Sequence, residues 1–140
     1  MKQVLDTPPN YIAIFSVFGK SEIEKHKPVF CYGDTIFNPF EVTITEDVEL
    51  HEMVHSKQQG ALPGIWWYNY LNDASFRVVQ EIEAYGSQYQ FVKKLIEVEG
   101  GSRKLIDWKK EKMAEALSSA LYGNILTYQQ AESRIRNYGK

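Results

Sequence analysis

The chain has 140 residues, a formal net charge of -2 at pH 7 and a pI near 5.9. This length suffices to bury a core without disulfides or metal staples. Lysines are interspersed with glutamates instead of forming a basic stripe, which argues against nucleic-acid binding. Cys31 is the single cysteine, which excludes an internal disulfide and suits a reducing compartment. We expect one domain over residues 1–140.

The N-terminal segment lacks the features of a targeting signal. The longest apolar run, Tyr11 to Phe18, has about half the length of a bilayer crossing, and no basic region precedes it. Residues 1–10 are expected to form an extended lead-in, because Pro8 and Pro9 disfavour a helix. The sequence thus predicts no signal peptide, no transmembrane helix and no membrane binding, and we expect a cytoplasmic protein.

Three segments in the N-terminal part of the chain have the composition of β-strands. The first is a continuous run of β-branched and aromatic residues, the second is a hairpin with a Gly-Asp turn, and the third alternates polar and apolar residues. They comprise residues 11–18, 29–37 and 41–45. We expect a small antiparallel or mixed sheet, whose last strand could present an exposed edge that binds a peptide as an added strand. His26, in the charged connection before the hairpin, is expected to be a surface residue.

A helix is expected over residues 46–60, with Thr45 as a suitable N-cap and acidic residues in its first turn. It contains the pattern HExxH, formed by His51, Glu52 and His55, which uses two of the three histidines. On a helix these histidines lie one turn apart on one face, where both imidazoles can bind one metal ion. Glu52 lies beside them and can take a proton from water without being a ligand.

A second long helix is expected over residues 76–98. Its apolar residues recur at spacings of three and four: Val78, Ile82, Tyr85, Tyr89, Val92 and Ile96. Glu81 lies about 60° from the centre of this face and Glu83 about 140° away. Glu81 is therefore expected to point inward, where an unpaired carboxylate is costly unless it binds a cation. Glu83 is expected to be a solvated surface charge.

The other segments are expected to be scaffold. Residues 65–71 are densely aromatic and fit a helix, a strand or a loop; we expect a wall of the core rather than a substrate pocket. A third helix is expected over residues 102–122, and a capping box at Thr127 begins a last helix that ends near residue 137. Gln58 and Gln59 are expected to be polar residues at a helix end.

The HExxH pattern alone lacks one metal ligand, because catalytic zinc needs three protein ligands and a position open to water. The longer pattern HExxHxxGxxH would need Gly and His where this chain has Gln58 and Ala61, which excludes that subclass. A Glu on a following helix completes a His₂Glu set. Glu81 is the best-placed candidate.

The pairing of HExxH with the later segment Glu81-Ile82-Glu83-Ala84-Tyr85 resembles the gluzincin metallopeptidases, and in particular their minimal single-domain forms in bacteria and bacteriophages. The resemblance covers about residues 32–92. It implies an α+β, zincin-like fold in which a small N-terminal sheet packs on the HExxH helix and a second long helix, with two further C-terminal helices. It also implies Zn²⁺ as the cofactor, with His51, His55 and Glu81 as metal ligands and Glu52 as general base. Tyr85 stands where larger members have an Asp that supports a ligand histidine.

Two functions fit this pattern. The leading hypothesis is a zinc-dependent endopeptidase that cleaves a peptide or protein, with Tyr85 or a tyrosine of residues 68–70 as candidate donor to the oxyanion. The alternative is a catalytically silent zincin-fold module with a binding or structural role, for instance in a phage particle or a toxin system. A protein partner is compatible with both, because so short a chain lacks an obvious second lobe to form a deep cleft.

Overall fold

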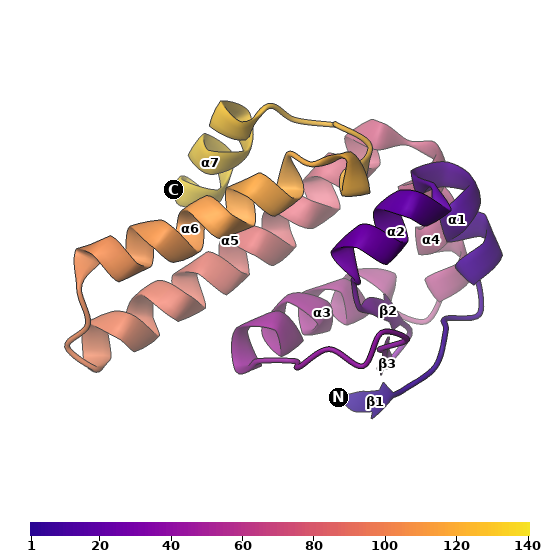
Figure 1. Cartoon of the computed structure of the whole chain (residues 1–140), viewed down its shortest axis with the longest axis horizontal. Helices are drawn as coiled ribbons and strands as arrows, with labels where there is room; N and C mark the ends of the chain where they lie inside the picture. The colour runs from indigo at the N-terminus through magenta and orange to yellow at the C-terminus, as the bar shows by residue number, and fades with distance from the viewer.

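The computed structural model describes residues 1–140 and shows an α+β fold that is mostly helical (Figure 1). The strands are β1 (Lys2–Val4), β2 (Phe30–Tyr32) and β3 (Thr35–Phe37). The helices are α1 (Tyr11–Phe18), α2 (Lys20–His26), α3 (Glu46–Gln59), α4 (Pro63–Asn72), α5 (Ala74–Val98), α6 (Arg103–Leu117), the 3₁₀ helix η1 (Ala120–Tyr122) and α7 (Tyr128–Arg136). None of the helices combines the length and the apolar character that a membrane crossing requires. The expected α+β class with a small mixed sheet is confirmed.

The three strands form one mixed sheet in the order β1-β3-β2. Strands β2 and β3 are the predicted antiparallel hairpin, with Tyr32 paired to Thr35 across the turn. Gly33 in that turn has a φ of 63°, which a residue without a side chain adopts at no steric cost. Strand β1 runs parallel to β3, so the expected lead-in of residues 1–10 contributes an edge strand. The sheet contacts the HExxH helix α3 through β2.

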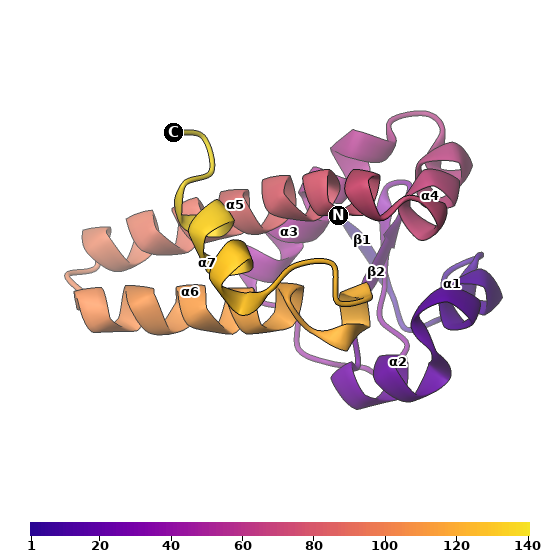
Figure 2. The same ribbon diagram turned by 90° about the horizontal axis from the view of Figure 1, so that it is seen from above.

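The prediction of a strand over residues 11–18 is wrong, because this segment is helix α1. A continuous apolar run fits a buried strand and a buried helix equally well by periodicity. Ile14 is buried and Tyr11, Phe15 and Phe18 are partly buried, whereas Ile12 is exposed. The inward residues thus recur at spacings of three and four, as on a helix. Helix α1 lies beside α4 at one end of the molecule, and the following α2 lies beside η1 (Figure 2).

The prediction of a strand over residues 41–45 is also wrong, because this segment has no regular structure. The side-chain amide of Asn38 pairs with Val42 as a neighbouring strand would. It donates to the carbonyl oxygen of Val42 over 2.8 Å and accepts from its backbone N–H over 3.0 Å. Strand β1 meanwhile occupies the edge of β3. Residues 41–45 therefore find the edge of β3 already occupied, and Asn38 supplies the hydrogen bonds that a partner strand would give to Val42.

Helices α5 and α6 form a long antiparallel hairpin, and α7 packs across both (Figures 1 and 2). Five of the six residues predicted for the apolar face of α5 are buried: Ile82, Tyr85, Tyr89, Val92 and Ile96. They pack against buried residues of α6 and α7, including Ile106, Leu117 and Ile135. The predicted capping box at Thr127 is present at the start of α7. Helix α3 lies along α5 on the side of the sheet.

The predicted helix over residues 102–122 divides into α6 and η1. Ser118 and Ser119 end α6, since their hydroxyl groups donate to the carbonyl oxygens of Ala114 and Ala116 over 2.8 and 2.6 Å. Such side-chain hydrogen bonds compete with the continuation of a helix. The chain turns there, so η1 lies beside α1 and α2.

The aromatic segment around residue 66, which the sequence leaves undecided, is helix α4. Trp66 and Trp67 are buried in a second core that joins α4 to α1, α2 and β2. Their indole N–H groups donate to the side-chain oxygen of Gln80 over 3.1 Å and to the carbonyl oxygen of Cys31 over 3.0 Å. The tryptophans thus belong to the core as expected, but both also line a cavity, which the prediction of a core wall alone did not include.

Candidate metal centre

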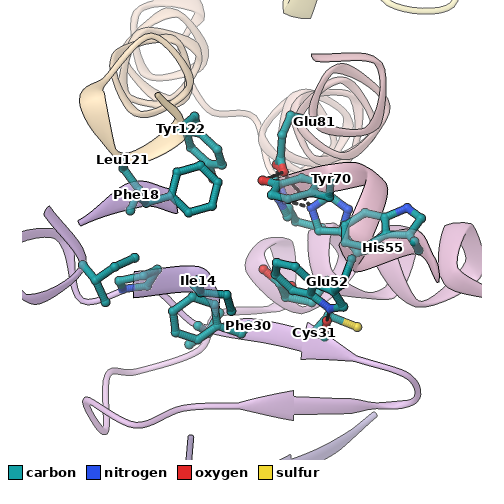
Figure 3. A pocket seen from close by; sticks show the side chains of 16 residues that line it. Ile14, Phe18, Phe30, Cys31, Glu52, His55, Tyr70, Glu81, Leu121 and Tyr122 are labelled. Carbon is teal, nitrogen blue, oxygen red and sulfur yellow. Dashed lines mark hydrogen bonds and ion pairs between the residues drawn. The ribbon is translucent and has the colours of Figure 1, made fainter. Parts of the chain in front are cut away.

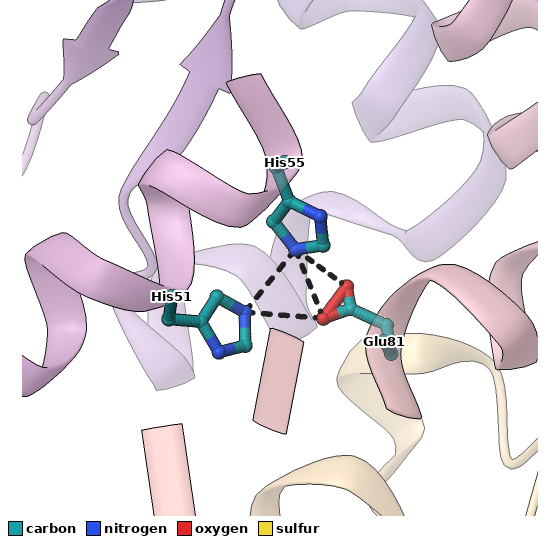
Figure 4. Close-up of side chains that lie close together, drawn as sticks. All are labelled: His51, His55 and Glu81. Atoms are coloured by element: carbon teal, nitrogen blue, oxygen red, sulfur yellow. Dashed lines mark hydrogen bonds and ion pairs between the residues drawn. The ribbon is translucent and has the colours of Figure 1, made fainter. Parts of the chain in front are cut away.

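The structure brings together His51 and His55 from α3 and Glu81 from α5 (Figure 4). The two Nε2 atoms lie 3.2 Å apart. Glu81 Oε1 lies 3.2 Å from His51 Nε2, and Glu81 Oε2 lies 3.0 Å from His55 Nε2. All three side chains are buried. Three residues predicted as metal ligands therefore converge from two helices that pack against each other.

These separations fit one face of a tetrahedron around a metal ion. Zinc binds histidine nitrogen and carboxylate oxygen at about 2.0–2.1 Å, which places the corners of a regular tetrahedron about 3.3 Å apart. Glu81 Oε1 lies 3.2 Å from each of the two Nε2 atoms, so all three edges of this triangle are 3.2 Å and close to that value. Two imidazoles and a carboxylate are also a ligand set that zinc takes in hydrolytic sites.

Gln88 fixes which nitrogen of His51 faces the centre. The Nε2 amide group of Gln88 donates to the Asp47 carboxylate over 2.7 Å, and a carboxylate only accepts. The oxygen of the same amide therefore faces Nδ1 of His51, 3.0 Å away, and Nδ1 must donate. Neutral His51 consequently presents the lone pair of Nε2 to the centre.

Gln58 does the same for His55. Its amide nitrogen donates to the carbonyl oxygen of Gln80 over 3.0 Å and to Glu83 Oε1 over 2.9 Å. Its oxygen accepts from Nδ1 of His55 over 2.8 Å, which leaves Nε2 as the ligand atom. Both histidines are thus held in the tautomer and orientation that a metal ion requires.

Glu81 is the buried negative charge of the cluster. Burial opposes its ionisation, but contact with His55 and His51 holds the pKa of Glu81 well below its ordinary value. Burial also opposes protonation of His55, yet the Glu81 carboxylate outweighs it and raises the pKa of His55 to about 9. Tyr70 donates its hydroxyl to Glu81 Oε2 over 2.9 Å. The arrangement therefore favours a positive charge at its centre, supplied by a proton or by a metal ion.

Glu52 lies next to the cluster on α3 and is also buried. Its carboxylate forms no hydrogen bond or ion pair with another side chain, in contrast to Glu81. Burial raises the pKa of Glu52, although the two histidines act in the opposite direction. A carboxylate with a raised pKa and no fixed partner is suited to accept and return a proton.

One cavity joins Glu52 to all three clustered residues (Figure 3). It has a volume of about 60 Å³, which is room for a few water molecules. Apolar side chains from α1, α2, β2 and η1 complete its wall, among them Ile14, Phe18, Ile23, Phe30 and Leu121. The open side of the ligand triangle therefore faces a small, largely apolar chamber.

The remaining predicted residues lie as follows. His26 is outside the cluster and pairs with Glu22 over 3.3 Å. Glu83 is half-buried and bonded to Gln58, so it is less solvated than expected. Tyr85 packs edge-on against His51, with 4.4 Å between ring centroids, but the hydrogen bond that supports this histidine comes from Gln88.

Sequence reasoning missed several residues around the centre. Gln58 lies one turn after His55, so a helical wheel places the two side by side. Gln88 lies seven residues after Glu81, which turns it by only about 20° and puts it on the same inward face. The signal available in the sequence was a glutamine on the same helix face as the predicted ligand Glu81. Tyr122 lines the cavity from η1, and no local pattern links it to HExxH.

The fold and the site define an α+β protein with a buried His₂Glu cluster able to hold a metal ion. Comparisons of the chain with protein-family models, with curated proteins and with solved structures found no match. The geometry of the site and the HExxH pattern therefore carry the functional argument.

Proposed function

We propose that this protein is a zinc-dependent peptide-bond hydrolase, with His51, His55 and Glu81 as metal ligands and Glu52 as general base. The observation that carries the proposal is the pairing of a preformed ligand triangle with an unpartnered, buried carboxylate in the same cavity. Gln88 and Gln58 direct both imidazole lone pairs to one point. The resemblance to the gluzincins supports peptide as the substrate class.

A bound zinc ion supplies a Lewis acid that acidifies water and polarises a carbonyl group. Glu52 takes one proton from the attacking water as the water oxygen bonds to the carbonyl carbon and the π electrons move to the carbonyl oxygen. When the C=O bond re-forms and the C–N bond breaks, Glu52 returns the proton to the leaving amine. Glu52 is placed for both transfers because its carboxylate shares a cavity with the three candidate ligands and forms no hydrogen bond with another side chain.

The number of ligands supports a catalytic rather than a structural metal. Structural zinc sites are closed by four protein ligands, whereas catalytic sites have three and an open position. The cluster contains three candidate ligands and no fourth. Its open side meets a cavity that can hold water. The buried setting also strengthens electrostatic interactions with a developing charge.

Substrate binding must differ from the arrangement expected from the sequence. Residues 41–45 form no strand and offer no edge to a peptide. The outer carbonyl of β2, at Cys31, already accepts hydrogen bonds from Gln59 over 2.9 Å and Trp67 over 3.0 Å. The part of the substrate that reaches the centre must therefore enter the cavity that holds Glu52 and the three candidate ligands.

The experiment compares the wild type with Glu52→Gln in a zinc analysis and in a peptidase assay on a broad peptide library. We expect about one zinc per chain in both proteins, and a loss of activity of about 10²-fold or more in the variant. Glu46→Gln, an exposed glutamate on the same helix, is the matched control and should retain both properties. Equal activity in wild type and Glu52→Gln would refute the role of Glu52.

One observation favours the alternative, a catalytically silent zincin-fold module. The three candidate ligands and Glu52 are all buried, and a cavity of about 60 Å³ is too small for a peptide segment. Turnover therefore requires α1, α2 or η1 to move. A wild type that holds stoichiometric zinc but cleaves no peptide in the library would favour this alternative over the hydrolase.

A further inference from the structure

Tyr122 places a phenol on the wall of the cavity that contains Glu52 and the metal-ligand cluster. It belongs to η1, the short helix that follows the break in α6. Figure 3 shows it beside Phe18 and Leu121, across the cavity from His55 and Glu52. The Tyr122 side chain thus shares one cavity with Glu52 and the three candidate ligands.

The hydroxyl of Tyr122 forms a pair with that of Tyr85, with 2.8 Å between the oxygens. Two hydroxyl groups carry two protons, and their mutual hydrogen bond uses only one of them. Neither oxygen has another hydrogen-bond partner in the protein. Tyr122 lines the cavity and Tyr85 does not. Either hydroxyl can be the donor of this bond. When Tyr85 donates to Tyr122, the proton of the Tyr122 hydroxyl is free for a group in the cavity.

The other tyrosines near the centre are less suitable donors. Tyr70 already donates to Glu81 over 2.9 Å, so its proton holds a metal ligand in place. Tyr68 is 68% exposed and does not line the cavity. The candidates expected from the sequence, Tyr85 and the tyrosines of residues 68–70, thus have supporting or peripheral positions.

Arg77 fixes Tyr122 relative to the rest of the site. This buried guanidinium donates to the carbonyl oxygen of Tyr122 over 3.1 Å and to those of Tyr70 and Leu71 over 2.8 and 3.1 Å. It also lies 4.8 Å from the centre of the Phe18 ring. One side chain therefore ties η1 to the end of α4 and to α1. Donors held in advance stabilise a transition state without a cost of reorganisation.

We propose that Tyr122 is the catalytic residue that donates a hydrogen bond to the oxyanion formed during hydrolysis, and that Tyr85 positions it. This inference rests on the proposed hydrolase function. No proton is transferred in this step: the phenolic O–H bond remains intact while the carbonyl oxygen carries the negative charge. Glu52 remains the only group that accepts and returns the proton of water.

The test uses the zinc-loaded protein and the variants Tyr122→Phe, Tyr85→Phe and Tyr68→Phe, each of which removes one hydroxyl. Binding of methylphosphonate, a tetrahedral anion that imitates the oxyanion, is measured by calorimetry. We expect Tyr122→Phe to weaken this binding about tenfold or more, as for a hydrogen bond to a charged group. In the peptidase assay the same variant should lower kcat about 10²-fold with little change in KM. Zinc content and Tm should match the wild type, and Tyr68→Phe is the control for both measurements.

The outcomes separate the two proposals. Weaker methylphosphonate binding in Tyr122→Phe without any turnover in the wild type would support the donor role and refute the hydrolase. Unchanged anion binding and unchanged kcat in a zinc-loaded Tyr122→Phe would refute the donor role and leave the hydrolase intact. A larger loss in Tyr85→Phe than in Tyr122→Phe would also overturn the assignment, because Tyr85 would then be the donor.

Discussion

The side-chain oxygen of Gln88 accepts a hydrogen bond from Nδ1 of His51 over 3.0 Å. The amide nitrogen of Gln88 is bonded in turn to Asp47, on the first turn of the HExxH helix. Asp47 also accepts from the Thr45 hydroxyl over 2.6 Å. Helix α3 therefore holds its own histidine in place through a residue of α5. This contact ties the orientation of a metal ligand to the packing of two helices.

Removal of the Gln88 amide should weaken metal binding without loss of the fold. Without Gln88, neutral His51 can carry its proton on Nε2, which blocks the ligand lone pair. We expect Gln88→Ala to lower the zinc affinity by about 10–100-fold, the usual effect of losing such a partner. Competition with a chromogenic chelator measures this affinity. Gln90→Ala, at an exposed glutamine of the same helix, is the control, and an equal loss in both variants would contradict the role of Gln88.

The assignment of the third ligand is tested by two neighbouring glutamates. Glu81 contacts both histidines, whereas Glu83 contacts Gln58. We expect Glu81→Gln to lose most of its zinc, because a neutral amide is a poor ligand for this ion, and Glu83→Gln to keep it. Elemental analysis of the purified variants gives the answer. Full zinc occupancy in Glu81→Gln together with loss in Glu83→Gln would reverse the assignment.

His55 makes stability and metal binding depend on pH. The contact with Glu81 raises its pKa from 6.5 to about 9 in the metal-free fold. A basic group whose pKa is higher in the folded than in the unfolded protein stabilises the fold. This stabilisation is complete at pH values below the pKa of the unfolded state, and it is lost as the pH rises through the pKa of the folded state. The metal-free protein should therefore lose stability between pH 6.5 and about 9. Zinc binds neutral imidazole and displaces the proton, so its affinity should rise over the same range.

Thermal unfolding at several pH values, with EDTA and with zinc, measures both effects. The Tm in EDTA should fall across this range, while the increase in Tm caused by zinc should grow. The same series on His55→Gln is the control and should lack most of this dependence. A Tm of the metal-free wild type that does not change with pH would show that His55 is not protonated in the fold.

The predictability of this fold depends on whether local sequence or distant contacts determine each part. The HExxH helix, the apolar face of α5 and the capping box of α7 follow from spacings within one segment, and the structure contains all three. Glu81 could be found because α5 is an amphipathic helix and Glu81 lies closer to the centre of its apolar face than Glu83 does. The sheet is different, since β1 pairs with β3 across more than thirty residues. Asn38 satisfies the backbone at Val42, and an alternating pattern does not reveal such a substitution.

The surroundings of the ligands were harder to predict than the ligands. Gln88 and His51 are 37 residues apart in the chain, and a glutamine on a helix face is usually solvated. Tyr122 reaches the cavity only because the chain turns after α6. Ligand residues follow from chemical type and spacing. The residues that surround the ligands are determined by tertiary packing, which cannot be deduced from any single segment of the sequence.

The helical form of residues 11–18 can be tested with two isoleucines. In a strand, Ile12 and Ile14 would point to the same face, because side chains alternate with a period of two. In the helix, Ile14 is 1% exposed and Ile12 is 84% exposed. We expect Ile14→Ala to lower the free energy of unfolding by about 2–5 kcal/mol and Ile12→Ala to change it by about 0.5 kcal/mol or less. Urea unfolding at a fixed zinc concentration measures both values. Losses of similar size at the two positions would be incompatible with helix α1 and would remove this helix from the wall of the cavity.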